Sequence, residues 1–403
     1  MIRRLREQDC EASLELTEFS FRLNLSAAER MRRLEQMKTD YVLGYYENDI
    51  LAAKLVILPF RMYLGGKKLD MGGIASVATW PEHRRKGMVG KLITHSLQAM
   101  REQGQTVSVL NPFSFVFYRK YGWGYFGEIK RYKYAVSRTT AIPVPGGYVE
   151  RKSRRDLAVI RDVYEAFAAK YNGMLSRDDA WWEHQVFRRK LGQLAVDFDE
   201  SGQPRGYVMY SVEGTVLDVK EFIYLDELSR SRLLRFLAMH DSMTEQVTFT
   251  APAGDLLVTL FDTPPARSEV NACYMTRIVD MKGFLEQYPF ESDGEEITLR
   301  FQVEDQQAPW NNGRFELTIE ADGHATATKL ELREVELGSA DGGAASGQAG
   351  WLAGPIHVFS SLFMGFGDSR SYVDSGLLAG DRKTAEMLDR LLSKQQPYIL
   401  DMF

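Results

Sequence analysis

The chain has 403 residues, of which 44% are hydrophobic and 26% are charged, which indicates two or three folded domains and excludes a disordered polymer. The net charge of −5 argues against nucleic-acid binding, and no apolar run is long enough to cross a bilayer. The two cysteines are far apart, and no apolar stretch follows the charged N-terminus, so we expect a reducing, cytoplasmic location and no membrane association.

The first part of the chain is expected to form a mixed α/β domain. Ser26 is a suitable N-cap for the second helix, and the turns between strands carry Asn, Asp or Gly. Helices are predicted over residues 11–21, 27–38, 88–100 and 115–120, and strands over 41–46, 50–59, 61–64, 68–79 and 106–110. This order places a strand, a basic turn and a helix in succession around residue 87.

That basic turn is the most informative segment of the sequence. The first N–H groups of a helix have no intrahelical partner, and the helix dipole favours negative charge there. Basic residues oppose that dipole, so an anionic ligand explains them better than a solvated helix start. Gly87 would let the backbone approach a diphosphate closely. The predicted anion site comprises Arg84, Arg85, Lys86, Gly87, Met88, Val89 and Gly90.

An aromatic segment, Phe117-Tyr118-Arg119-Lys120-Tyr121-Gly122-Trp123, follows the helix. Together with the basic turn, it resembles the acetyl-CoA site of the GNAT superfamily of N-acetyltransferases. A splayed strand at Val77, Ala78 and Thr79 would leave backbone groups free for the pantetheine amides and the thioester carbonyl. The alternative for this strand is ordinary sheet pairing.

Acyl transfer from a thioester to an amine also needs a proton donor for the departing thiolate. A phenol with a reference pKa of ~10 stays protonated at neutral pH and can still donate to a thiolate whose thiol has a pKa of ~8.5. Tyr118 is the candidate because it follows the predicted cofactor helix. Tyr121 and Tyr125 are the other possible donors, and the alternative role for Tyr118 is that of a packed core aromatic.

The same reaction needs a base for the attacking ammonium. Chain ends are usually polar and frayed, whereas this one is apolar up to Phe403, which predicts a docked terminus. An α-carboxylate has a reference pKa of only ~3.5, so it would act as a base only if desolvation raised its pKa or a water relayed the proton. A simple packed terminal strand is the alternative.

The remainder of the chain suggests two further units. Residues 141–147 have the Pro/Gly composition of a linker, and the part after them repeats the α/β rhythm without a second basic glycine turn. A flexible loop is predicted over 338–350, and the six histidines show no metal-ligand spacing, so no metal is expected. Further helices are predicted over 154–170, 177–191, 228–240, 356–363 and 383–392, and strands over 193–197, 205–213, 215–225, 296–304 and 314–320.

The whole chain resembles the Eis (enhanced intracellular survival) family of acetyltransferases. The motifs are residues 77–87, residues 117–122 and the terminal Phe403. The resemblance implies an α/β (α+β) fold: a GNAT domain at 1–142, a degenerate GNAT-like domain at 143–286 and a sterol-carrier-protein-like domain at 287–403. It also implies that Tyr118 is the general acid and that the carboxylate of Phe403 is the general base.

The resemblance further implies acetyl-CoA contacts at Phe113 and Ser114, a homo-hexamer, and acetylation of several amines of one aminoglycoside. The expected acceptor is a small-molecule or peptide amine. Two alternatives stay open: a protein lysine acetyltransferase, and a lipid-binding protein with a vestigial acetyltransferase module.

Overall fold

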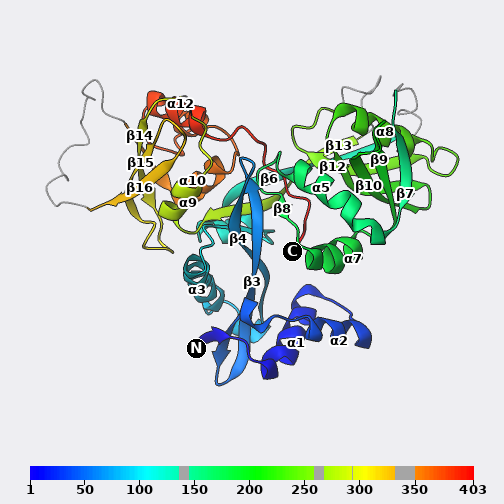
Figure 1. Cartoon of the computed structure of the whole chain (residues 1–403). Coiled ribbons are helices and arrows are strands. Elements are labelled where there is room, and N and C mark those ends of the chain that lie inside the picture. Colours follow the sequence, from blue (N-terminus) through cyan, green and yellow to red (C-terminus); the bar gives the residue numbers. More distant parts are fainter. Residues whose placement is uncertain (136–144, 258–266, 293, 332–349) are drawn as a thin grey trace.

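The computed structural model describes residues 1–135, 145–257, 267–292, 294–331 and 350–403. Figure 1 shows two large lobes on either side of a central region in which long strands cross, with α1 and α2 below them. The helices are α1 (Cys10–Phe21), α2 (Ala27–Glu35), α3 (Met88–Glu102), α4 (Phe115–Arg119), α5 (Leu157–Ala168), α6 (Asp179–Trp181), α7 (Phe187–Arg189), α8 (Glu227–Ala238), α9 (Met281–Gln287), α10 (Ile356–Phe363), α11 (Ser369–Asp374) and α12 (Arg382–Leu391).

The strands form two sheets, one of which runs through most of the molecule. They are β1 (Ile2–Arg4), β2 (Val42–Glu47), β3 (Ile50–Leu64), β4 (Lys67–Thr79), β5 (Val107–Leu110), β6 (Gly124–Ala135), β7 (Tyr148–Lys152), β8 (Leu175–Ser176), β9 (Gln193–Phe198), β10 (Pro204–Glu213), β11 (Val216–Tyr224), β12 (Gln246–Pro252), β13 (Arg267–Ile278), β14 (Ile297–Glu304), β15 (Gly313–Ile319), β16 (Ala325–Leu330) and β17 (Trp351–Pro355).

Local chemistry sets several of these boundaries as the sequence predicts. Ser26 caps α2 through a capping box with Glu29, which occupies two backbone donors at the helix start. Asn48 and Asp49 both have positive φ, as a tight turn between β2 and β3 requires. In place of the predicted helix over 177–191, the structure has three short segments: α6, a π-helical turn (Trp182–Val186) and α7. The prediction of one continuous helix is therefore wrong.

The large sheet has the order β1-β2-β3-β4-β5-β13-β6-β12-β11-β10-β9-β7, with β8 paired to β3. β13 returns from the second part of the chain and lies between β5 and β6, antiparallel to both. β6 then pairs with β12 on its other side. The first two parts of the chain therefore share one continuous sheet, and the predicted boundary over 141–147 lies mostly outside the described residues.

The third part of the chain builds the smaller sheet, in the order β16-β15-β14-β17. Aromatic side chains of β14, α9 and α10 fill its core, among them Phe284, Phe301 and Phe359, which are 0% exposed. Nearly all of the predicted loop over 338–350 lies outside the described residues. After α12 the chain crosses back to the junction of the other two parts, where the C-terminus lies (Figure 1).

Candidate active site

A cavity of about 890 Å³ brings the sequence-predicted residues together. All of the predicted site residues line it except Lys86 and Ser114. Lys86 is exposed and lies 3.9 Å from Glu47, and the Ser114 hydroxyl accepts a hydrogen bond from the Phe117 N–H and caps α4. The cavity residues come from α1, β4, the turn before α3, the α4 region and the C-terminal tail.

The strand β4 is interrupted where it meets this cavity. β5 pairs with β4 only from Met71 to Ile74, so the following residues have no partner strand on that side. Ser76 has a φ of +49°, and the register between β3 and β4 shifts at this point, as in a β-bulge. The Thr79 hydroxyl is buried without a hydrogen-bond partner among the described residues. The predicted splay is confirmed, and it exposes backbone groups toward the cavity.

The turn before α3 has the geometry of an anion site. Gly87 is the N-cap, with a φ of +76°, and a Cβ at this position would meet nothing within 4 Å. The first turn of α3 contains no acidic residue, so its backbone N–H groups face no competing side chain. Gly90 makes room for the hydroxyl of Tyr121, which would lie 2.8 Å from an added Cβ.

The basic side chains of the turn divide into two kinds. His83 and Lys86 both lie near Glu47, at 2.9 and 3.9 Å. Arg84 and Arg85 are exposed, line the cavity, and form no salt bridge within the described residues. Two guanidinium groups are therefore available to an anion beside the start of α3. These groups, the open Gly87 and the splayed β4 fit a nucleotide diphosphate with an extended thioester arm.

Tyr118 lies on α4 and is 3% exposed, with its ring between those of Phe113, Phe117 and Trp123. Burial raises the pKa of its hydroxyl, so the group stays protonated at neutral pH. Among the described residues the hydroxyl has no hydrogen-bond partner. The Tyr125 hydroxyl, in contrast, donates to Glu128 at 2.8 Å. The Tyr118 hydroxyl thus faces the cavity with a proton that it donates to no neighbouring side chain.

The C-terminal tail is docked, as its apolar sequence predicts. Tyr398, Ile399 and Asp401 are 2–3% exposed. The Asp401 carboxylate accepts hydrogen bonds from Arg177 Nε at 3.0 Å and Trp181 Nε1 at 3.0 Å. This buried ion pair fixes the tail two residues before its end, because a charge removed from water is stable only when it is fully paired.

The ring of Phe403 packs against residues of the first part of the chain. It packs 5.0 Å from the ring of Phe60 and 6.3 Å from that of Tyr274. Gly73 on β4 lies beneath it, since a Cβ there would come within 2.9 Å of the Phe403 ring. The terminal residue thereby reaches the same cavity as Tyr118 and the α3 turn.

Sequence reasoning missed one wall of the cavity. Ser20 and Phe21 at the end of α1 line it, as do Asn111 and Met402. Phe21 is 50% exposed and Met402 is 61% exposed. Neither residue belongs to a motif, so nothing in the sequence distinguished them from other surface apolar side chains.

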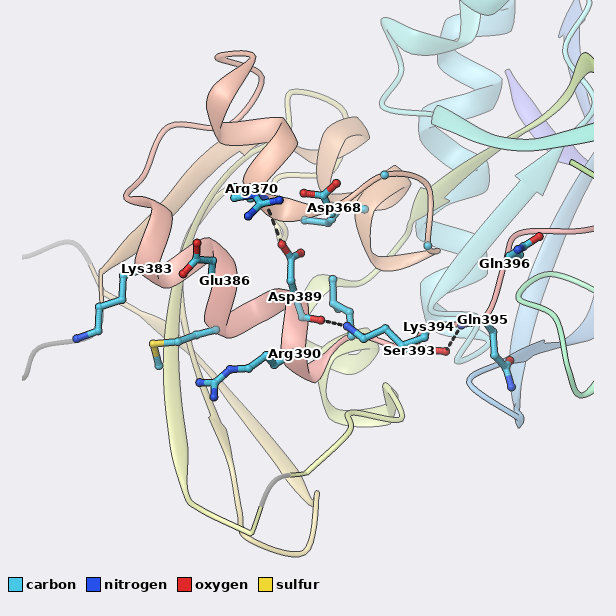
Figure 2. Close-up of a pocket in the computed structure, with 15 residues that line it drawn as sticks. Asp368, Arg370, Lys383, Glu386, Asp389, Arg390, Ser393, Lys394, Gln395 and Gln396 are labelled. Carbon is cyan, nitrogen blue, oxygen red and sulfur yellow. Dashed lines mark hydrogen bonds between the residues drawn. The ribbon is translucent and has the colours of Figure 1, made fainter. Parts of the chain in front are cut away.

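A second cavity, of about 800 Å³, lies in the third part of the chain (Figure 2). Its lining combines charged side chains, among them Asp368, Arg370, Lys383 and Asp389, with the apolar Leu362, Met387 and Leu392. The Asp389 carboxylate accepts hydrogen bonds from the N–H groups of Ser369 and Arg370 at the start of α11.

Within the described ranges, no three His, Cys, Asp or Glu side chains gather in a group that could hold a metal ion. No helix in the same ranges is both long and apolar enough to span a membrane.

Comparisons with known proteins identify three regions. Residues 1–126 match a family model described as an acetyltransferase (GNAT) domain, and residues 173–278 match a second model with that description. Residues 281–400 match a sterol carrier protein domain. The predicted fold class, tandem GNAT-like domains followed by a sterol-carrier-protein-like domain, is confirmed.

Similar proteins match over most of the chain. An uncharacterized N-acetyltransferase of Streptomyces griseus is 24% identical over 375 residues, which are 84% of this chain and 83% of that protein. N-acetyltransferase Eis of Mycobacterium tuberculosis is 26% identical over 287 residues, 67% of this chain and 68% of that protein.

Solved structures agree. A probable N-acyltransferase from Enterococcus faecalis has a TM-score of 0.89 at 28% identity, covering 100% of this chain and 99% of that one. Eis1 from Mycobacterium abscessus, at 18% identity and with 100% of both chains covered, has a TM-score of 0.78, which supports the fold alone. The chain thus carries two GNAT acetyltransferase domains followed by a sterol-carrier-protein-like domain, and over most of its length it is similar to the Eis-like N-acetyltransferases.

Proposed function

We propose that this enzyme transfers the acetyl group of acetyl-CoA to a primary amine in a single ternary complex, with Tyr118 as general acid and the α-carboxylate of Phe403 as general base. One observation carries the proposal. The unpartnered hydroxyl of Tyr118, the terminal residue and the open turn at Gly87 all line one cavity. Acetyl-CoA supplies the activated thioester when it is bound.

The α3 turn would hold the diphosphate through its first N–H groups and through Arg84 and Arg85. Backbone groups of β4 at Val77, Ala78 and Thr79, which have no partner strand on the β5 side, would bind the pantetheine arm and polarise the thioester carbonyl. The Thr79 carbonyl oxygen is the exception, since it accepts a hydrogen bond from Arg84 Nε at 3.4 Å. These two contacts would place the thioester between the bulge of β4 and the hydroxyl of Tyr118.

The chemical step then needs two proton transfers. The Phe403 carboxylate takes a proton from the acceptor ammonium, directly or through water, so that the nitrogen can attack the thioester carbonyl carbon. A C–N bond forms, the C–S bond breaks, and the Tyr118 hydroxyl gives its proton to the departing thiolate. Because burial raises the pKa of Tyr118, the hydroxyl is protonated at the pH at which the amine reacts.

A tyrosine series tests the assignment of the acid. Tyr118→Phe should lower kcat by about a hundredfold or more while leaving acetyl-CoA affinity intact, because only the proton donor is removed. Thiol release with an amine acceptor measures turnover, and calorimetry measures binding. Tyr125→Phe is the matched variant, since its hydroxyl is already donated to Glu128. Near-normal turnover of Tyr118→Phe, or a larger loss in Tyr125→Phe, would exclude Tyr118 as the acid.

Three finer proposals accompany this reaction. The acceptor is a small-molecule or peptide amine, and aminoglycosides acetylated at several positions are the acceptors implied by the likeness to Eis. The enzyme works in the cytoplasm, where Cys10 and Cys273 would stay free thiols. It assembles as a homo-hexamer. Sedimentation velocity at micromolar concentration should show a six-chain species, and a monomer under those conditions would contradict the assembly.

A further inference from the structure

The charge around the active-site cavity bears on the identity of the acceptor, which the proposed function leaves open. None of the described residues that line the cavity is Asp or Glu. The lining includes three cationic side chains, Arg84, Arg85 and Lys120. The negative charge available to an acceptor is the α-carboxylate that the proposed mechanism assigns to Phe403. A single carboxylate suits one ammonium group, whereas a polycation would need several.

A cluster of four arginines lies beside the end of the tail. Arg189 on α7 donates a hydrogen bond to the carbonyl oxygen of Met402, a cavity residue. Arg188, its neighbour, lies 4.0 Å from Glu29 of α2, which joins the two helices. The other two members are Arg32 and Arg33 on α2. We call these four side chains the arginine cluster.

The cluster has more guanidinium groups than nearby carboxylates, which are Glu29 beside Arg32 and Arg188, and Asp401 near Arg189. Arg32 and Arg33 form no salt bridge within the described residues, and their buried Nε atoms have no hydrogen-bond partner there. Arg30, one turn away on the same helix, is instead paired with both Glu11 and Glu18. Glu29 is already engaged as the capping-box residue of α2, where it accepts hydrogen bonds from Ser26.

The guanidinium groups of the cluster also repel one another electrostatically. Burial, followed by the charges of Arg32 and Arg33, lowers the pKa of the Arg188 guanidinium. The four like charges outnumber Glu29 and Asp401, so a further anion among them would lower the free energy of the folded protein. Guanidinium groups bind carboxylate and phosphate oxygens in pairs, so either anion would fit.

We propose that the acceptor is a small amine that also carries a carboxylate or a phosphate, and that the arginine cluster binds this anionic group. The inference rests on the proposed function. The amine would reach the Phe403 carboxylate in the cavity, while the anionic end stays at the α2–α7 surface beside Met402. The acceptor would thus be held at both ends by charges of opposite sign. In this inference it takes the place of the aminoglycosides implied by the likeness to Eis, which carry several ammonium groups and no anion.

Matched acceptors test this directly. Thiol release is measured with a series of ω-amino carboxylates and ω-amino phosphates of increasing length, each compared with the amino alcohol and the diamine of the same carbon count. We expect kcat/KM to be about tenfold or more higher for one anionic class at its best length, because charge-assisted hydrogen bonds are the strong ones. The two anionic classes show which anion the cluster prefers. Added salt should reduce the preference.

Arginine variants locate the anion site. Arg33→Gln and Arg188→Gln should raise KM for the anionic acceptor and leave the amino alcohol unchanged. Arg155→Gln, an exposed arginine outside the cavity, is the control. A diamine or amino alcohol used as well as the anionic acceptors, or a preference unaffected by both variants, overturns the inference alone. Absence of thiol release with every amine overturns the proposed function, and this inference with it.

Discussion

Lys54 shows how a single buried charge positions one wall of the active site. It is 3% exposed, and its ammonium donates to the Ser13 carbonyl oxygen at 2.7 Å, the Ser13 hydroxyl at 2.7 Å and the Thr17 hydroxyl at 2.6 Å. These oxygens belong to α1, which supplies Ser20 and Phe21 to the cavity. Lys54 itself is paired in register with Ala78 at the bulge of β4. One ammonium therefore ties α1, the missed wall, to β3 beside the bulge of β4.

The protonation of Lys54 predicts a dependence of stability on pH. Burial lowers its pKa from 10.5 to about 8. Between these values the unfolded chain binds more protons than the folded chain, so the free energy of unfolding contributed by Lys54 rises with pH. The slope is at most about 1.4 kcal/mol per pH unit. Below about pH 8 Lys54 is protonated in both the folded and the unfolded chain, so the full cost of burying its charge lowers the free energy of unfolding.

Urea unfolding at several pH values between about 7.5 and 9.5 measures this slope, with Lys54→Met as the reference. Subtracting the variant removes the contributions of tyrosines, many of which titrate in the unfolded chain just above this range. We expect the wild-type protein to gain stability relative to Lys54→Met as the pH rises. Parallel pH profiles for the two proteins would contradict the assignment of a low pKa to Lys54.

Among the elements, the segment from β4 through Gly87 to α3 was the most predictable from sequence. Its chemistry is local: a strand, a residue with positive φ and a helix start lie within a few turns of one another. A Cβ added at Gly87 would meet no other atom, so a substitution there changes the charge beside the turn more than it changes packing.

Gly87→Asp should weaken acetyl-CoA binding by about tenfold or more relative to Gly87→Asn. Both side chains have the same shape and both tolerate left-handed φ, so the pair differs only in a negative charge beside the proposed diphosphate site. Isothermal titration calorimetry gives the two affinities, and thermal unfolding shows whether both variants fold. Equal affinities would mean that the diphosphate lies elsewhere.

Other elements were beyond sequence reasoning for identifiable reasons. The first half of β13 is polar and exposed, so it lacks the alternation that marks a strand, and its pairing with β5 and β6 joins residues more than a hundred positions apart. The π-helical turn at Trp182–Val186 interrupts a sequence with ordinary helical periodicity. There, the packing of Trp182 against Tyr164 and Phe187 outweighs local preference.

At the scale of the whole molecule, the tail connects all three parts of the chain beside the cavity. It leaves the third part, its Asp401 is held by Arg177 of the second part, and its last ring packs on Phe60 and Gly73 of the first. The apolar composition of the tail predicts docking, but not these partners, because every one of them lies more than 200 positions away. The shared sheet keeps the three contacts in a fixed relation.

The position of the terminal carboxylate is therefore the sharpest test of the proposed mechanism. Appending residues after Phe403 would replace its carboxylate by an amide, which cannot accept a proton at neutral pH. Deleting Phe403 would draw the new carboxylate back by up to ~3.5 Å, beyond the hydrogen-bond reach of a general base. Asp401 would still be held by Arg177 in both variants, and the α3 turn would be untouched.

Both variants should thus fold and bind acetyl-CoA yet lose about a hundredfold or more of kcat with the same acceptor amine. A chain carrying the same extra residues at its N-terminus controls for the added sequence. Gly73→Ala supplies an independent test, because its Cβ would come within 2.8 Å of the Phe60 ring and 2.9 Å of the Phe403 ring and would displace this pair without altering any charge. It should lower kcat while sparing acetyl-CoA affinity. Equal turnover of the extended and native chains would show that Phe403 only packs, and the base would then have to be a carboxylate or a water outside the tail.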